Sequence, residues 1–269
     1  MLAKGEQSIE VAPHATTEVS LGGVRLPWNI REAYLNLSWT PKKKSAFIGT
    51  DDEVAYDQFV LPANSQYRPT LAKLSEKPEI QIDPKTGALT SYIYEGQEYL
   101  ASPVRLSLYR PATDNDNREK KGGAKVWRKL GLNHLVQRVL SVKTSGHTTY
   151  SEVKLLNDKN DTIGSATFEY TIRKDGILSV QTRFVPDTTF VSSLARVGLV
   201  FEMPHSFNRV TYLGRGEHET YADRKLSGRI GIYHTDAERM FHYYVRPQAT
   251  GNRTDVRWMQ VSDELEKGL

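Results

Sequence analysis

The chain has 269 residues, a quarter of them charged and a tenth aromatic, as in a globular protein of one large or two ordinary domains. A net charge of +4 and short basic clusters disfavour a nucleic-acid-binding protein, which would carry a longer basic stripe with interleaved aromatics. The absence of cysteine excludes disulfides and thiolate metal sites. No apolar run approaches the roughly 20 residues of a membrane span, and no signal peptide is visible at the start.

The first 66 residues carry short alternating segments and no helical period. In the segment 33–39, Leu35, Leu37 and Trp39 point one way and the polar residues between them point the other. Glycine and proline punctuate the connections. We therefore predict a partial immunoglobulin-like β-sandwich, because four strands fall short of the seven that such a sandwich needs. The expected strands are 8–11, 17–21, 33–39 and 54–61.

Residues 67–78 are rich in proline and predict a linker, with Leu71 and Leu74 as possible docking residues. From residue 79 onward, long alternating runs with tight turns predict a large antiparallel two-sheet sandwich. One short helix is expected at 125–130, capped by Gly131. After residue 213 the regular pattern fades, and we expect this second domain, 79–269, to be truncated at its C-terminus. The expected strands are 80–82, 89–94, 104–109, 135–143, 148–156, 165–173, 177–185, 194–203 and 210–213.

A polar tract follows the strand 104–109. Two carboxylates, two amides, a hydroxyl and a guanidinium fall between Arg110 and Asn117. Asp and Asn side chains bond their own backbone two residues on, so we expect linked turns here. Such a rigid turn suits either holding a sugar or shaping the loop behind it, and a self-satisfied turn without a ligand is the commoner case.

Other polar clusters allow chemical interpretations, each with a structural alternative. Glycoside hydrolysis needs two carboxylates about 5 to 10 Å apart, and Asp114/Asp116 and Glu217/Glu219 are near neighbours, although such pairs more often cap backbone amides. A histidine-rich metal site matches no known ligand spacing. Trp127 and Trp258 are potential sugar platforms, but isolated aromatics in β-rich sequence are more often core. The candidate metal ligands are His218, Glu219, His234 and His242.

Three motifs together resemble a known family. The segments 109–116 (YRPATDND), 212–224 (YLGRGEHETYADR) and 244–258 (YVRPQATGNRTDVRW) resemble, in order and spacing, the C-terminal part of large β-galactosidases of glycoside hydrolase family 2. Residues 1–66 resemble the fourth domain of that family, an immunoglobulin-like sandwich, minus its first strands. The region from about residue 78 resembles the fifth domain, a super-sandwich related to galactose mutarotases. The resemblance therefore implies an all-β fold.

The resemblance also implies a function for the parent enzyme. The family hydrolyses terminal non-reducing β-D-galactosides with two glutamates on a barrel that this sequence does not contain, so the chain alone is expected to be inactive, with no catalytic residue and no metal ligand. The magnesium and sodium of family members are bound mostly elsewhere, and we expect no cofactor in this chain. The expected partners are galactose or a β-galactoside, the missing barrel of the same polypeptide and, in the parent, a second copy. A soluble protein of the bacterial cytoplasm or periplasm is implied, with no nucleic acid or membrane partner.

Within the family, the segment 117–124 matches a loop that opens and closes at the active site. The resemblance makes the preceding tract the anchor of that loop and gives Gly122 and Gly123 its freedom of movement. Glu219, Asn252 and Arg253 are possible sugar-facing residues. Two alternatives remain: a non-catalytic carbohydrate-binding sandwich, and a mutarotase-like enzyme using His218, His242 and Glu219. The anchor residues are Arg110, Asp114, Asn115, Asp116 and Asn117.

Overall fold

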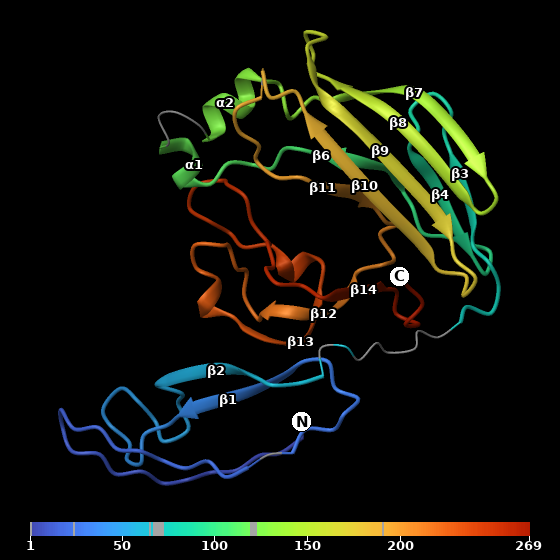
Figure 1. Ribbon diagram of the computed structural model, residues 1–269. Coiled ribbons are helices and arrows are strands. Elements are labelled where there is room, and N and C mark those ends of the chain that lie inside the picture. Colours follow the sequence, from blue (N-terminus) through green and yellow to red (C-terminus); the bar gives the residue numbers. More distant parts are fainter. Residues whose placement is uncertain (1, 24, 65, 67–72, 119–122, 190) are drawn as a thin grey trace. The chain divides into compact units, whose positions relative to one another are not determined.

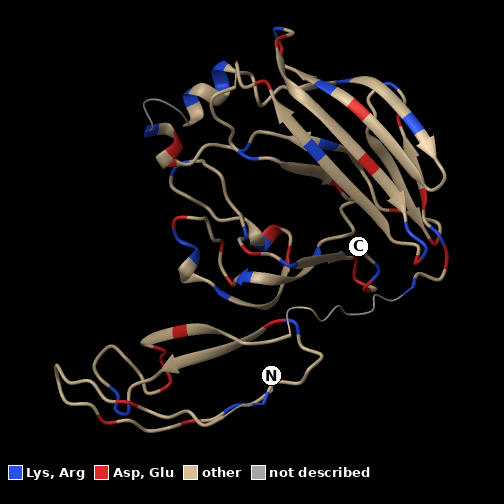
Figure 2. Cartoon of the chain, viewed as in Figure 1, with Lys and Arg blue, Asp and Glu red and all other residues tan. Residues whose placement is uncertain are grey.

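The computed structural model describes every residue except 1, 24, 65, 67–72, 119–122 and 190 (Figure 1). The chain divides into two compact units, Met1–Thr70 and Leu71–Leu269. Antiparallel strands make up nearly all of the regular structure of the described residues, so the all-β prediction is confirmed. In Figure 2 the described lysines and arginines are interspersed with acidic residues along the strands and loops. Among the described residues, no helix has the length and apolar character needed to cross a bilayer.

The first unit contains one strand pair. Strands β1 (Ala33–Trp39) and β2 (Ala55–Leu61) are antiparallel, with Ala33 opposite Leu61 and Trp39 opposite Ala55. The expected strands at 8–11 and 17–21 are wrong: these segments pair with no other strand and are almost wholly exposed. Ala33 is the one buried apolar residue among the described residues of this unit. The described part of the unit therefore lacks the apolar core of a sandwich.

A four-stranded antiparallel sheet forms one layer of the second unit. Its order is β10-β9-β8-β7, so each strand pairs with its neighbour in sequence. The hairpins turn at Gly146 and Gly176, whose φ angles of +60° and +86° suit glycine. The predicted strands in this region are confirmed to within three residues. The strands are β7 (Val136–Ser145), β8 (Thr148–Leu156), β9 (Thr162–Ile172) and β10 (Leu178–Pro186).

The opposing layer contains a three-stranded sheet, β3-β4-β5, and a strand pair, β6-β11. Gly87 closes the β3–β4 turn with a φ of +69°, and a Cβ there would lie 1.8 Å from the Ser151 hydroxyl, so the position requires glycine. Strand β5 was not predicted, and β11 is shorter than the expected 194–203. The strands are β3 (Glu79–Ile82), β4 (Leu89–Tyr94), β5 (Gln97–Glu98), β6 (Ser102–Ser107) and β11 (Gly198–Glu202).

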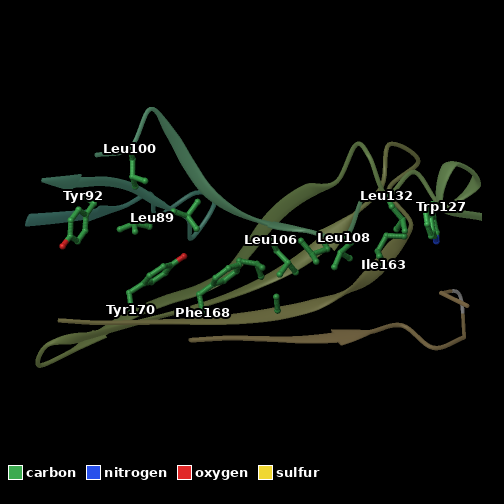
Figure 3. Packing of buried hydrophobic residues seen from close by; sticks show 14 of the residues in the cluster. Leu89, Tyr92, Leu100, Leu106, Leu108, Trp127, Leu132, Ile163, Phe168 and Tyr170 are labelled. Atoms are coloured by element: carbon green, nitrogen blue, oxygen red, sulfur yellow. The ribbon is translucent and has the colours of Figure 1, made fainter. Parts of the chain in front are cut away.

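The hydrophobic core fills the space between these layers. Figure 3 shows Phe168 and Tyr170 of β9 pointing toward Leu89 of β4, with Leu106 and Leu108 further along the same interior. The rings of Phe168 and Tyr170 stack in parallel with centroids 5.9 Å apart. All five side chains are at most 7% exposed. The apolar residues of the alternating pattern that predicted the strands are therefore the residues that face the interior.

A second three-stranded sheet, with order β13-β12-β14, follows the core strands. Leu213 of β12 pairs with Ile232 on one side and Trp258 on the other. Only part of β12 was predicted, as 210–213, and β13 and β14 were missed. The strands are β12 (Arg209–Gly216), β13 (Arg229–Asp236) and β14 (Trp258–Ser262), accompanied by the short 3-10 helices η1 (Lys225–Ser227) and η2 (Glu238–Met240).

Two short α-helices lie in the connection between β6 and β7. Helix α2 (Gly123–Lys129) is the predicted helix, and Gly131 ends it with a φ of +67°, while the Leu132 amide donates to the Trp127 carbonyl at 3.1 Å. Helix α1 (Asp114–Arg118) occupies the tract that was expected to form linked turns. Of the predicted linker, residues 67–72 lie outside the described part. The Leu74 amide donates to the Asp175 carbonyl at 2.9 Å, so Leu74 docks on the β9–β10 turn.

Candidate functional site

The polar tract folds as a helix because its first turn carries a capping box. The Asp116 amide donates to the Thr113 hydroxyl at 3.3 Å, and the Thr113 amide donates back to the Asp116 carboxylate at 2.7 Å. The Thr113 hydroxyl also donates to that carboxylate at 2.8 Å. Thr113 is therefore the N-cap of α1, and an acidic residue three positions on completes the reciprocal pair. The expectation of linked turns is corrected to a capped helix.

Arg110 ties this helix to the body of the unit. Its guanidinium makes a bidentate pair with Asp116, at 2.6 and 3.2 Å, and lies 5.2 Å from the centre of the Trp127 ring. Trp127 is 4% exposed and its indole nitrogen donates to the Ser193 hydroxyl at 3.2 Å. Trp127 is thus a core residue, as the commoner interpretation held, and not a sugar platform.

The Asp116 carboxylate has a pKa below the ordinary value for aspartate. Burial alone would raise its pKa, but the hydrogen bonds from Arg110 and from the backbone and hydroxyl of Thr113 together lower the pKa below the ordinary value of 3.8. Because the folded pKa is depressed, this carboxylate stabilises the folded chain above pH 3.8, and the contribution is lost as the pH falls through the folded pKa.

We therefore expect Asp116→Asn to destabilise the chain at neutral pH by about 1–3 kcal/mol, and to cost progressively less below about pH 4. The measurement is urea unfolding of both chains at several pH values. Parallel loss of stability in the two chains on acidification would show that Asp116 does not carry this pH dependence.

A hollow of about 560 Å³ opens beside this anchor, within the second unit. One wall comes from the segment that leads into α1, and the other from the loop that follows η2. The Gln248 side-chain oxygen joins the two walls by accepting a hydrogen bond from the Asp114 amide at 3.2 Å. The lining residues are Tyr109, Pro111, Ala112, Asn117, Arg128, Phe241, His242, Tyr243, Tyr244, Pro247 and Gln248.

Glu219 holds the second wall in place. Its carboxylate is 5% exposed and accepts hydrogen bonds from Arg224 at 2.5 Å and from the Gly251 amide at 2.7 Å. Thr250 donates to it at 3.2 Å, and the Tyr244 hydroxyl donates as well. Four donors from the chain thus occupy the carboxylate that was expected to face a sugar and to act as the base of a mutarotase-like enzyme.

Asn252 and Arg253, the other two residues expected to face a sugar, donate hydrogen bonds to the chain itself. The Asn252 amide donates to the Thr220 carbonyl at 2.7 Å. The Arg253 guanidinium donates to the Tyr212 hydroxyl at 2.9 Å and to the Glu217 carbonyl at 3.2 Å. Both side chains therefore brace the loop that follows Gly251.

The other candidate groups are scattered over the described residues. The histidine nearest Glu219 in sequence, His218, contacts the Ser227 hydroxyl at 2.8 Å, and His234 contacts the Thr211 hydroxyl at 2.9 Å. The described part of the chain contains no group of three or more His, Asp or Glu placed to hold a metal ion.

The structure describes all of the predicted anchor, residues 110–117, but only part of the loop that follows it. Arg110, Asp114, Asp116 and Asn117 come together around α1, whereas Asn115 is exposed on it. Gly122 and the rest of 119–122 lie outside the described residues. Gly123 begins α2 with a φ of +59°. The spacing Thr113-x-x-Asp116 was the sequence signal that would have predicted α1.

Comparison with known proteins identifies the family. Residues 75–267 match the family model described as beta galactosidase small chain, and residues 1–62 match the model described as beta-galactosidase, domain 4. The chain belongs to the β-galactosidase family. The resemblance deduced from the three polar motifs is therefore confirmed.

Curated β-galactosidases align with the chain over most of its length. It is 30% identical to the β-galactosidase of Priestia megaterium (strain DSM 319 / IMG 1521), over 100% of this chain and 27% of that protein. Beta-galactosidase 2 of Enterobacter cloacae is 26% identical over 96% of this chain and 27% of its own length. The β-galactosidase BgaC of Bifidobacterium adolescentis is 25% identical over 68% of this chain and 17% of its own length. The chain thus spans about a quarter or less of these relatives.

Proposed function

We propose that this chain is the C-terminal region of a β-galactosidase, where it is structural and contributes the segment around α1 to the rim of the active site. The parent enzyme would hydrolyse terminal β-D-galactosides, and its catalytic glutamates would come from another part of the polypeptide. The observation that supports this most strongly is the alignment of the whole chain with 27% of a β-galactosidase. A region of that size completes an enzyme rather than constituting one.

The chemistry of the described carboxylates supports catalytic silence. Hydrolysis needs one carboxyl as an acid and a second as a nucleophile or base, both free to reach the sugar. In the first near-neighbour pair, Asp116 is committed to Arg110 and Thr113. In the second, Glu219 is buried under four donors from the chain. Neither pair therefore offers two available carboxyl groups.

The geometry of α1 supports the role of an anchor. Three hydrogen bonds between Thr113 and Asp116 and a bidentate pair with Arg110 fix the helix to the end of the β6 segment. A helix fixed on one side is a firm base for the polypeptide that follows it. We propose that the segment 117–124 touches the active site of the parent, although residues 119–122 lie outside the described part.

The test is an assay with a chromogenic β-galactoside. We expect no turnover by the purified chain, and full turnover when it is co-expressed with the catalytic part of its own β-galactosidase. In that pair, Arg110→Ala should lower kcat about tenfold or more, because a small misplacement of an active-site segment is costly. Arg173→Ala is the matched control, since Arg173 pairs with Asp175 on a distant turn at 2.7 Å.

Two results would contradict the proposal. Turnover by the purified chain alone would show that it carries its own catalytic residues. Failure of the chain to restore activity to the catalytic part, with both parts folded, would show that it does not complete the enzyme.

A further inference from the structure

The loop after η2 presents a run of aromatic rings to the hollow beside α1. Tyr243 is 88% exposed and Phe241 is 52% exposed, and their rings meet edge to face with centroids 4.8 Å apart and an interplanar angle of 71°. His242 and Tyr244 form a second such pair, at 4.5 Å and 68°. Two ring pairs in four consecutive residues leave flat apolar faces at the edge of a concave surface. Such faces mark a binding site more often than a device for stability.

The polar side chains of the hollow supply hydrogen-bond donors and one permanent positive charge. Arg128 of α2 lines the hollow, and it makes no ion pair or hydrogen bond with the described residues. None of the described lining residues is an aspartate or a glutamate, so no carboxylate there competes for the guanidinium. Gln248 accepts from the Asp114 amide through its oxygen and keeps both hydrogens of its own amide nitrogen available. Asn117 donates one amide hydrogen to the Thr113 carbonyl at 3.1 Å and keeps the second. These donors suit a ligand group that accepts hydrogen bonds and carries negative charge.

We propose that this hollow binds a small aromatic carboxylate, an anion with one flat apolar ring and one carboxylate group. The ring packs against Tyr243 and Phe241, and the carboxylate accepts the planar fork of Arg128 in bidentate fashion. The volume of about 560 Å³ lies within the range of roughly 300–1,000 Å³ that is usual for small-molecule sites. The residues that define this site all belong to this chain, so the site does not depend on how the parent enzyme acts.

The chemistry of the lining separates this ligand class from its rivals. An organic cation would be repelled by Arg128, with no carboxylate in the described lining to attract it. A neutral aromatic molecule would cover the guanidinium without giving it an acceptor, which costs free energy. An inorganic anion would satisfy the guanidinium but leave the ring faces in water. An aromatic carboxylate meets both needs at once.

The wall that carries the rings is fixed by the chain itself. The Tyr244 hydroxyl donates to the buried Glu219 carboxylate, and the Gly251 amide donates to the same group at 2.7 Å. Gln248 joins this wall to α1 through the Asp114 amide at 3.2 Å. The ring faces are therefore in place before a ligand arrives, which lowers the cost of ordering the site on binding.

The experiment is saturation-transfer NMR on the purified chain with three probes that share one ring and differ in charge. Phenylacetate is the anion, phenylacetamide is its neutral counterpart, and benzylamine is the cation. We expect transfer to the ring protons of phenylacetate at millimolar concentrations, with binding of phenylacetamide and benzylamine weaker by about fivefold or more. Added salt should weaken the binding of phenylacetate, because salt screens an exposed charge pair.

Two variants separate the charge from the ring faces. Arg128→Gln should weaken the binding of phenylacetate about fivefold, because it keeps a donor but loses the charge and the fork. Tyr243→Ala should weaken it by a similar factor, because it removes the most exposed ring face. The matched controls are Arg138→Gln on β7 and Tyr150→Ala on β8, which alter exposed residues of the same types and should leave binding unchanged.

Three results would overturn the proposal. No saturation transfer to phenylacetate would show that the hollow does not take this class of anion. Equal binding of phenylacetate, phenylacetamide and benzylamine would show that Arg128 does not select the ligand by its charge. Equal binding of phenylacetate by the wild type and by both Arg128→Gln and Tyr243→Ala, with all three chains folded by circular dichroism, would place the anion elsewhere on the chain.

Discussion

Phe168→Ala is expected to lower the free energy of unfolding of the second unit by about 3–5 kcal/mol. Phe168 is 1% exposed and stacks on Tyr170 between the two layers (Figure 3). Removing the ring forfeits its transfer free energy and leaves a cavity that the flanking strands cannot close, because β8 and β10 pair with β9 on both sides. The measurement is urea unfolding followed by circular dichroism.

The control for this substitution is Phe201→Ala on β11. Phe201 is 47% exposed, so the same atoms are removed with much less apolar burial lost and no closed cavity formed. We expect a cost below about 1 kcal/mol. Equal costs at the two positions would show that the interior between the layers is not the main store of stability in this unit.

The strands that the sequence predicted best are those whose alternation is bounded by turn residues. Strand β4 follows the turn that Gly87 closes, and β8 lies between Gly146 and Asn157; both have the predicted ends. Strand β1 was also predicted to the residue. Local alternation and turn residues agree in these segments, so tertiary contacts do not shift the ends of the strands.

Elements with mixed local signals were missed. Strand β13 alternates Ile230 and Ile232 with glycine, and β14 is only Trp258–Ser262, so neither shows a clear period of two. Both segments become strands because they pair with β12, and this pairing leaves no local pattern in the sequence. The segments 8–11 and 17–21 show the reverse case, because they alternate weakly but find no partner strand. Backbone pairing across the sheet decides such segments.

The candidate site also has one part that follows from local sequence and one part that does not. Arg110, Thr113 and Asp116 lie within seven residues, so their association was open to prediction from sequence, although the capping box was not recognised. The hollow could not be predicted from the sequence, because its two walls are joined by a hydrogen bond between Asp114 and Gln248, which are 134 residues apart. Sequence order says nothing about which distant loop will meet a given turn. The exposed rings at 241–244 were visible in the sequence only as an aromatic run.

Glu219→Ala is expected to destabilise the second unit by about 3 kcal/mol. The substitution leaves four donors without their acceptor, of which the Gly251 amide and the Tyr244 hydroxyl serve the loop at the hollow. The cost lies at the lower end for removing one partner of a buried ion pair, because the Arg224 side chain is 42% exposed and regains water. Urea unfolding of the variant and wild type measures the difference.

Two further variants separate charge from packing. Glu219→Gln keeps the shape and one acceptor oxygen, so it should cost about 1–2 kcal/mol. Glu152→Ala removes an exposed glutamate on β8 and should stay within about 0.5 kcal/mol of wild type. If Glu219→Ala behaves like Glu152→Ala, the carboxylate does not hold the loop.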